Sequence, residues 1–516
     1  AADFPFHQLA DPANQSSRVI RDSTNRVGSA GMFARKFGGL LSGLSAENGS
    51  DIEDPTFRVG ALNLRQAGDR NAPSVLNAVY YLRNFWDGRA SETFTGATPF
   101  GLSDTRAIVL SSAGGNLKSE PLRLDKSSLA SQSVGPVLNL AEMSYNARSW
   151  PLVGKKMLAL RPLANQRISA DDSVLGRFAN NRAPGFPRGT VYLDLVKAAF
   201  QPAYWDSTQL VDELGNLLNP GSSVVEANRF TQAEFNFSLF FGLAIQAYET
   251  TLVSDDAPID RLEGNPLTAL NNSELSGMRL FTGRTGCAVC HAGAEFSLAT
   301  HSGVNGADPL KKGRDTGYFY IGVRPIAEDP GLGTLDGFGK PLATTLPTDD
   351  SPASARGRFK TPGLRNVEFT GPYLHNGGLA TLGQVMEFYN RGGDFPVNAE
   401  NGPDIRTLNL SPQDQADLIA FMKALTDDRV RYERAPFDHP ELCVPDGHLQ
   451  TAGASGVRSN GNPAFSMSAA DRWVGIPAVG RNGNTAPCKL SRNCLRALEP
   501  TGAALTICPT RARSRP

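Results

Sequence analysis

The sequence predicts a mainly α protein of two or more domains, with long loops and a few short strands. Three observations support this prediction. A chain of 516 residues exceeds what one hydrophobic core usually serves. Apolar residues recur with helical spacing in several separate stretches, whereas strand-like stretches are few. The 52 Gly and 35 Pro residues are spread along the chain, which indicates much loop between helices of modest length.

Helices are expected where the apolar periodicity is clearest, which is at 190–201, 231–252, 273–282, 381–390 and 411–425. The last of these begins with Ser411 as N-cap and Pro412 at the first helical position. The best strand candidate is GYFYIGV at 317–323. It lies in a Gly/Pro-rich region, 302–363, that we interpret as a long ordered excursion.

The polar, turn-rich stretch LVSDDAPIDRLEGNP at 252–266 separates two helical patterns and is the predicted domain boundary. We therefore expect an N-terminal domain over 1–252 and a C-terminal domain over 253–435. The remaining residues, 436–516, are expected to form an extension. From Cys488 onward the sequence contains no Asp and shows neither helical nor strand periodicity, which predicts an atypical, disordered tail.

The charge balance excludes some partner classes. Lys+Arg and Asp+Glu each total 51, so net charge gives no reason to expect nucleic acid or an anionic membrane as partner. The most apolar stretch, 237–252, is too short and too interrupted by polar residues to span a bilayer. Four cysteines near the C-terminus allow three disulfide pairings, none of which the sequence favours: Cys443, Cys488, Cys494 and Cys508.

The stretch RTGCAVCHAGAEF at 284–296 contains a C-x-x-C-H motif formed by Cys287, Cys290 and His291. In this motif the two thiols add to the porphyrin vinyl groups as thioethers, and the histidine supplies the proximal iron ligand. A redox C-x-x-C does not require the histidine, and a zinc site needs a second ligand pair that the other Cys and His spacings do not offer. The motif therefore predicts one covalent c-type haem. Because bacteria make this attachment outside the cytoplasm, it also predicts a periplasmic or secreted protein.

The second axial ligand of the iron is expected within 359–393. The helix predicted there has one apolar face, formed by Leu382, Val385, Met386 and Tyr389. Met386 and Tyr389 are neighbours on that face and both residue types can bind haem iron, although core packing is the alternative for each. His375 is the rival nitrogen ligand, or else a hydrogen-bond donor to a haem propionate from its turn.

These stretches resemble the bacterial di-haem cytochrome c peroxidase/MauG family. The haem motif and 359–393 resemble its C-terminal half, and AYETTLVSDDAPIDRLEGN resembles the link between its two cytochrome c domains. RNAPSVLNAVYYLRNFWDGRAS (70–91) and QSVGPVLNLAEMS (132–144) are similar to its N-terminal signatures. The resemblance covers roughly 65–430, with family-foreign insertions at 92–130, 150–230 and 302–358. It implies two mainly α cytochrome c-like domains.

In the C-terminal domain, the resemblance implies that Cys287, Cys290 and His291 attach the electron-relay haem. The distal ligand there is Met in typical peroxidases of the family and Tyr in the MauG branch. Tyr389 falls on that position and Met386 is three residues short of it, so Tyr389 is favoured. A phenolate ligand would hold the iron ferric and lower its potential.

In the N-terminal half, Trp86 matches the tryptophan that relays electrons between the two haems, with a core anchor as the alternative. Gln132, Pro136 and Glu142 match the distal pocket over the peroxide-reacting haem. Glu142 would take a proton from one peroxide oxygen and return it to the other.

The resemblance implies further ligands and partners. Asn71, Thr370 and Pro372 match a calcium site between the domains, where carbonyl and amide oxygens suit a hard cation. The implied partners are hydrogen peroxide and a small electron-donor protein, such as a cytochrome c or a cupredoxin, or a protein substrate. Family members often form homodimers, and nothing in this sequence identifies an interface.

The family attaches its peroxide-reacting haem through a second C-x-x-C-H in the N-terminal domain, and this sequence contains the motif once. We therefore expect that Ala1 is not the natural start and that the second haem site lies upstream. His7, the only histidine before His291, could ligate a non-covalent haem, but a turn or surface histidine is the preferred interpretation.

The sequence thus favours a haem-dependent oxidoreductase that reduces hydrogen peroxide with electrons relayed through the C-terminal haem. Two alternatives stay open: a mono-haem electron-transfer cytochrome, and a di-haem oxygenase resembling the bacterial rubber-cleaving enzymes. The pair Gln132 and Glu142 favours peroxide over dioxygen, whereas the long insertions favour the oxygenase.

Overall fold

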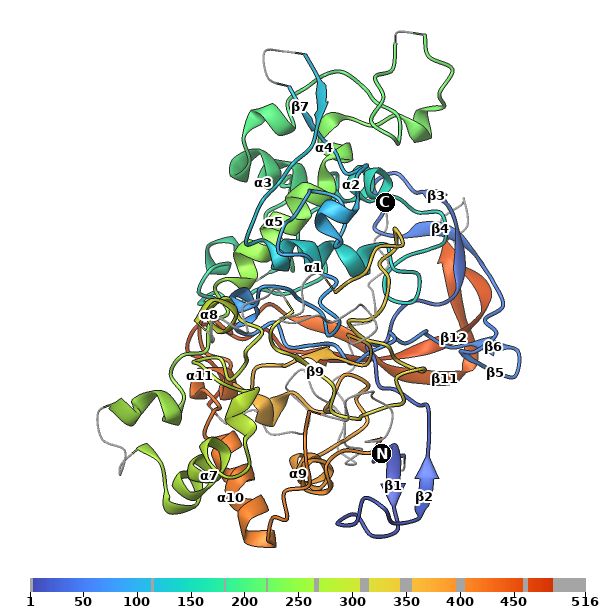
Figure 1. Ribbon diagram of the computed structural model, residues 1–516. Helices are drawn as coiled ribbons and strands as arrows, with labels where there is room; N and C mark the ends of the chain where they lie inside the picture. The colour runs from blue at the N-terminus through green and yellow to red at the C-terminus, as the bar shows by residue number, and fades with distance from the viewer. Residues whose placement is uncertain are drawn as a thin grey trace.

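The computed structural model describes most of the chain, and helices and short strands alternate along it with long loops (Figure 1). The described residues are 3–112, 116–180, 182–219, 221–263, 269–306, 315–343, 355–395, 404–457 and 463–485. Within them, no helix combines the length and the apolar character that crossing a membrane requires.

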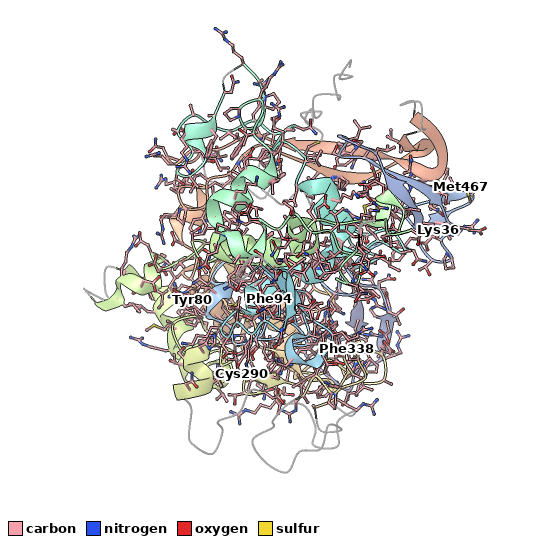
Figure 2. The ribbon with its side chains drawn as sticks, turned by 90° about the horizontal axis from the view of Figure 1, so that it is seen from above. Lys36, Tyr80, Phe94, Cys290, Phe338 and Met467 are labelled. Carbon is pink, nitrogen blue, oxygen red and sulfur yellow. The ribbon has the colours of Figure 1, made fainter. Side chains whose placement is uncertain are left out.

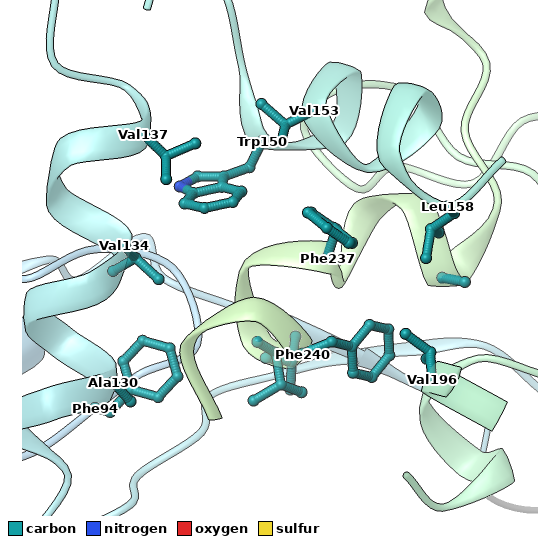
Figure 3. Close-up of a cluster of buried hydrophobic side chains, with 13 residues drawn as sticks. Phe94, Ala130, Val134, Val137, Trp150, Val153, Leu158, Val196, Phe237 and Phe240 are labelled. Atoms are coloured by element: carbon teal, nitrogen blue, oxygen red, sulfur yellow. The ribbon is translucent and has the colours of Figure 1, made fainter. Parts of the chain in front are cut away.

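Five helices form the core of the N-terminal half: α1 (Ser128–Val137), α2 (Trp150–Met157), α3 (Tyr192–Ala199), α4 (Gln232–Phe235) and α5 (Phe237–Glu249). α1 packs against α5, and the ring of Trp150 packs among apolar side chains of both (Figure 3). The helix predicted over 231–252 is interrupted at Asn236. The Asn236 side chain instead bonds both the N–H and the carbonyl of Leu110, which ties the helix to the strand beside it.

The C-terminal half is built on α7 (Asn272–Thr282), α9 (Leu382–Arg391) and α10 (Pro412–Lys423), with the short helices α8 (His301–Gly306) and α11 (Asp428–Arg431). α7 runs against α10 so closely that any side chain at Gly277 would collide with the carbonyl of Asp417. The predicted N-cap is confirmed, because the Ser411 hydroxyl accepts a hydrogen bond from the N–H of Asp414. Phe281, Phe388 and Phe421 fill the space between these helices.

Single 3-10 turns punctuate the loops: η1 (Ala78–Tyr80), η2 (Gly101–Ser103), η4 (Gly176–Phe178), η5 (Pro202–Tyr204), η6 (Glu226–Asn228), η7 (Pro258–Glu263), η8 (Cys287–Val289) and η10 (Val367–Phe369). Four antiparallel pairs of short strands accompany them: β1 (His7–Leu9) with β2 (Val19–Asp22), β3 (Arg35–Leu40) with β4 (Glu47–Asp51), β7 (Val109–Ser111) with β8 (Lys118–Glu120), and β9 (Tyr318–Phe319) with β10 (Phe359–Lys360). The strand predicted over 317–323 is thus only two residues long.

A long hairpin, β11 (Leu442–Val457) and β12 (Pro463–Ile476), follows the last helix, so the expectation of only short strands is wrong for this segment. It joins β5 (Arg58–Val59) and β6 (Leu62–Asn63) in a sheet of order β11-β12-β6-β5. Figure 2 places Met467 of β12 beside Lys36 of β3, and the Met467 N–H donates to Asp51 of β4. Cys443 at the start of β11 is disulfide-bonded. The tail predicted from Cys488 lies outside the described residues.

Each end of the chain packs against the half of the molecule formed by the other end. β1 and β2 lie beside the C-terminal half near α9 (Figure 1), where the Phe6 N–H donates to the carbonyl of Gly378 at 3.0 Å. His7 is 5% exposed, with Nδ1 3.6 Å from an Asp394 oxygen, so its interpretation as a turn or surface histidine is wrong. β12 in turn extends the sheet of the N-terminal half through Ser468 and Asn63. Each half is therefore completed by a segment from the opposite end of the chain.

Candidate cofactor site

A cavity of about 570 Å³ lies between α7, α9, α10 and the 71–86 loop. This volume falls within the roughly 300–1,000 Å³ of pockets that enclose small molecules and cofactors. Ten of the twelve predicted site residues line it: Asn71, Trp86, Cys287, Cys290, His291, Thr370, Pro372, His375, Met386 and Tyr389. The two that do not are Gln132 and Glu142.

Cys287, Cys290 and His291 are presented by one tight turn. Gly286 adopts φ 70°, a conformation that glycine reaches without strain, and η8 follows directly. The N–H of His291 then donates to the Cys287 carbonyl at 2.9 Å, which fixes the spacing of the three side chains. Both cysteines are free, and burial raises the pKa of each, that of Cys290 to about 12. A C-x-x-C redox centre needs a lowered thiol pKa, so the geometry favours attachment chemistry over disulfide exchange.

His291 is held in the tautomer that a metal ligand requires. Its Nδ1 lies 2.9 Å from the carbonyl oxygen of Phe296, and donation there leaves the lone pair on Nε2. Burial lowers the pKa of His291 to about 4, so the ring is neutral at physiological pH. The two thiols, the neutral imidazole and the cavity volume together fit a covalently attached haem.

Tyr389 and Met386 line the same cavity from α9. That helix is fixed at its start by the Thr381 side chain, which accepts the N–H of Gln384, and it ends at Gly392 with φ 87°. Burial raises the pKa of Tyr389, and Cys287 and Cys290 raise it further, which places the phenol close to the attachment thiols.

His375 lines the cavity, and its ring nitrogen Nε2 faces a carboxylate without forming a hydrogen bond of good geometry. Nε2 lies 3.3 Å from a carboxylate oxygen of Asp329, and the ring stacks on Phe359 with centroids 3.6 Å apart and planes inclined by 11°. Arg70 binds the same carboxylate at 2.7 Å. This arrangement favours Tyr389 or Met386 over His375 as the iron ligand.

Trp86 stands in the cavity wall, held at both its backbone and its side chain. Its Nε1 donates to the carbonyl of Asn71 at 2.7 Å, and its own carbonyl accepts the N–H of Lys360 at 2.7 Å. The indole meets the His375 ring edge-on, with centroids 6.4 Å apart. The side chain is therefore in a single position beside the cofactor space.

The residues of the predicted calcium site come together in part. The Asn71 amide donates to the carbonyl of Pro372 at 2.6 Å, and its backbone N–H donates to the His375 carbonyl at 2.8 Å. The Thr370 hydroxyl donates to the carbonyl of Val367 at 3.3 Å. Asn71 and Pro372 thus join the two halves, and the calcium ion stays a prediction.

Gln132 lies in α1, and Glu142 lies in the turn after it. Both residues belong to the N-terminal half of the molecule. The Gln132 amide oxygen is buried and has no hydrogen-bond partner among the described residues. Glu142 is partly buried, and burial raises its pKa while Arg89 opposes the shift. Arg89 stacks over Phe85, 4.4 Å from the ring centroid, and Phe85 in turn packs against Gly135 of α1. The 85–89 loop therefore carries Trp86 in the cavity wall and packs against α1, the helix that contains Gln132.

Comparison with known proteins finds a matching family and several relatives. A family model described as di-haem cytochrome c peroxidase matches residues 45–175. Cytochrome-c peroxidase IdrP1 of Denitromonas iodatirespirans is 35% identical over 207 residues, 36% of this chain. The methylamine utilization protein MauG of Methylorubrum extorquens is 29% identical over 206 residues, 40% of this chain. The family model and these relatives support the assignment of the chain to the di-haem cytochrome c peroxidase/MauG family.

The matched segments span about half the length of these two family members, 48% of IdrP1 and 49% of MauG. Cytochrome-c peroxidase IdrP2 of Denitromonas iodatirespirans is 29% identical over 53% of this chain and 72% of its own length. Among solved structures, the diheme peroxidase BthA from Burkholderia thailandensis aligns with a TM-score of 0.40 and 21% identity, over 72% of this chain and 76% of that one.

Two residues escaped the sequence interpretation: Lys360, which lines the cavity, and Asp329, which contacts the cavity residue His375. Lys360 lies within the quoted stretch 359–393, but a single lysine before Thr-Pro gives no sign of burial. Asp329 lies in the stretch interpreted as a family-foreign insertion, and its pairing with Arg70 joins residues 259 positions apart. No local pattern could have revealed that contact.

Proposed function

We propose that the chain is a haem-dependent oxidoreductase of the peroxidase type, with two cytochrome c-like domains. Its C-terminal domain, 253–435, would carry one c-type haem on Cys287 and Cys290, with His291 as proximal ligand. The supporting observation is that these side chains share one cavity with Tyr389 and Met386 on the facing helix. When bound, a c-type haem supplies an iron that gains and loses single electrons.

The protein supplies the ligands and their protonation states. The hydrogen bond from His291 Nδ1 to Phe296 orients the imidazole and makes Nε2 the better donor. Tyr389 would supply the second protein ligand to the iron, because its phenol lines the same cavity as both attachment thiols. Met386 is 7% exposed and belongs to the apolar core of the C-terminal half, which supports a packing role.

Trp86 is the proposed electron relay between this haem and a peroxide-reacting haem in the N-terminal domain. Its indole stands in the cavity wall, and its neighbours in the 85–89 loop touch α1, which carries Gln132. A rigid indole held by hydrogen bonds at two points keeps a constant distance to its redox partners.

Glu142 and Gln132 are the proposed catalytic groups at the peroxide. A carboxyl whose pKa is raised by burial exchanges protons more readily near neutral pH, as general acid–base catalysis requires. The unpartnered Gln132 oxygen offers a hydrogen-bond acceptor to an incoming hydroperoxide. Hydrogen peroxide is thus the proposed substrate, with a small periplasmic or secreted cytochrome c or cupredoxin as electron donor. A calcium ion at Asn71, Thr370 and Pro372 would fix the two halves in register.

The test begins with haem stoichiometry. Pyridine haemochrome titration against protein mass should give one covalent haem in this chain and two in a version extended upstream in its gene. The extended form should consume peroxide with a reduced cytochrome c, and Glu142→Gln should slow that reaction about 100-fold or more while haem content is unchanged. One haem in both forms would contradict the peroxidase proposal and support a mono-haem electron carrier.

A further inference from the structure

Three cationic side chains line the cofactor cavity, and they differ in how their charge is balanced: Lys360, Arg365 and Arg406. The Arg365 guanidinium forms two hydrogen bonds to the Asp260 carboxylate, at 2.6 and 2.7 Å. Arg406 is exposed to solvent. Lys360 is 5% exposed, and no carboxylate among the described residues pairs with it.

The position of Lys360 is set by the short strand β10. Alternating side chains of a strand point to opposite faces, so Phe359 stacks on His375 while Lys360 is directed to Tyr81. The backbone N–H of Lys360 donates to the Trp86 carbonyl at 2.7 Å, which anchors the strand to the relay loop. Lys360 Nζ lies 3.5 Å from the centroid of the Tyr81 ring.

Tyr81 cannot serve as the counter-ion. It is buried, and burial raises the pKa of its phenol, so the ring is neutral. Its hydroxyl is also engaged, because it accepts the N–H of Gly363. The aromatic face alone stabilises an ammonium by far less than the cost of burying an unpaired charge. Burial accordingly lowers the pKa of Lys360 to about 7.

The two acids in the cavity wall are already paired. Glu295 accepts the Asn77 amide at 2.7 Å and lies 3.9 Å from Arg365. Asp404 accepts the N–H of Tyr320 at 2.8 Å and lies 3.5 Å from Arg358. The negative charge that balances Lys360 would therefore come from a molecule bound in the cavity rather than from the side chains of the cavity wall.

We propose that the ammonium group of Lys360 binds a carboxylate of the cofactor, on the side of the cavity where Trp86 stands. A haem presents such carboxylates as its propionates. This inference rests on the proposed function, since it assumes that a haem fills the cavity. It makes Lys360 a positioning residue that orients the haem edge toward Trp86 and places a positive charge near the iron.

The reduction potential of the bound haem tests the inference. A nearby positive charge disfavours the ferric state, so Lys360→Met should lower the midpoint potential at pH 7, and Lys360→Gln should lower it likewise. Lys360→Arg retains the charge and should restore most of the lost potential. The matched control is Lys36→Met, an exposed strand lysine that lies far from Cys290 (Figure 2). It should leave the potential unchanged.

The outcomes separate this inference from the proposed function. If the unmodified chain binds no covalent haem, the proposed function is wrong and the inference falls with it. If the unmodified chain, Lys360→Met and Lys360→Arg all carry one haem and share one potential, only the role of Lys360 is contradicted. Equal downward shifts in the Arg and Met variants would also overturn it, because charge would then not be the cause.

Discussion

The Asp329 carboxylate lies 3.3 Å from Nε2 of His375 and fixes the histidine ring flat against Phe359. Arg70 binds the same carboxylate and also pairs with Asp87 at 2.6 Å, next to Trp86. Interactions with His375 and Arg70 outweigh burial and hold the pKa of Asp329 well below its usual range. A residue of the long insertion thus supports His375 from behind, and His375 lines the cofactor cavity.

Asp329→Asn should therefore destabilise the fold. The variant leaves Arg70 with one carboxylate instead of two and weakens the partner of a buried histidine, which should cost about 1–3 kcal/mol. Urea unfolding measures the change in the free energy of unfolding. Glu328→Gln is the control, because Glu328 is an adjacent, more exposed carboxylate whose pairing with Arg324 is worth about 1 kcal/mol or less. Equal losses in the two variants would contradict a special role for Asp329.

Replacing both attachment cysteines should abolish the covalent cofactor. Cys287→Ala combined with Cys290→Ala leaves no thiol for a thioether, so haem staining after denaturing electrophoresis should disappear. Cys443→Ala removes a disulfide-bonded cysteine at the start of β11 and should keep full haem staining. Stain retained in the double variant would rule out attachment at this motif.

Tyr389→Phe should change the spin state of the C-terminal haem and raise its potential, because an anionic phenolate favours the ferric iron. Absorption spectra and a redox titration give both quantities. Met386→Leu keeps the volume of an apolar neighbour on the same helix and should leave the spectrum as it was. The reverse pattern would assign the ligand to Met386.

A pH effect on stability is expected from His439. Burial lowers the pKa of this histidine, but the nearby Glu433 carboxylate, 3.6 Å from Nε2, and the hydrogen bond to the Pro440 carbonyl outweigh that effect, and the folded-state pKa is raised. A raised histidine pKa stabilises the fold fully below the unfolded value of about 6.5, and this contribution is lost as pH rises through the folded value.

Urea midpoints at pH 5.5 and 8.5 should therefore show a loss of stability at the higher pH that His439→Gln reduces. Because other groups titrate over the same range, the informative quantity is the difference between the two proteins. An identical pH dependence in both would show that the pairing with Glu433 carries no stability.

The clustering of the candidate haem-attachment residues was predictable because its information is local. Cys287, Cys290 and His291 lie within five positions, and Met386 and Tyr389 lie one helical turn apart, so spacing alone sets their geometry. The cap at Ser411 was predictable for the same reason.

Contacts between segments that are distant in the sequence could not be predicted from local spacing patterns. No residue close to Lys360 in the sequence indicates that its side chain contacts the ring of Tyr81. β11 and β12 were missed because their sequence is rich in Gly, Ala and Ser and lacks a clear alternation of apolar and polar residues. The burial of His7 depends on Asp394, which only the folded chain brings near.

The packing of each chain end against the opposite half constrains the order in which the molecule is assembled. The sheet that contains Asn63 gains a third strand only when Ser468 pairs with it. Ser468 emerges from the ribosome after the whole segment that contains the C-x-x-C-H motif has been made. The N-terminal half cannot mature as an independent unit during synthesis. A chain cut at the predicted domain boundary near 252 would yield an N-terminal piece without β12 and a C-terminal piece without β1 and β2. The two pieces should therefore be recovered by co-expression rather than one at a time.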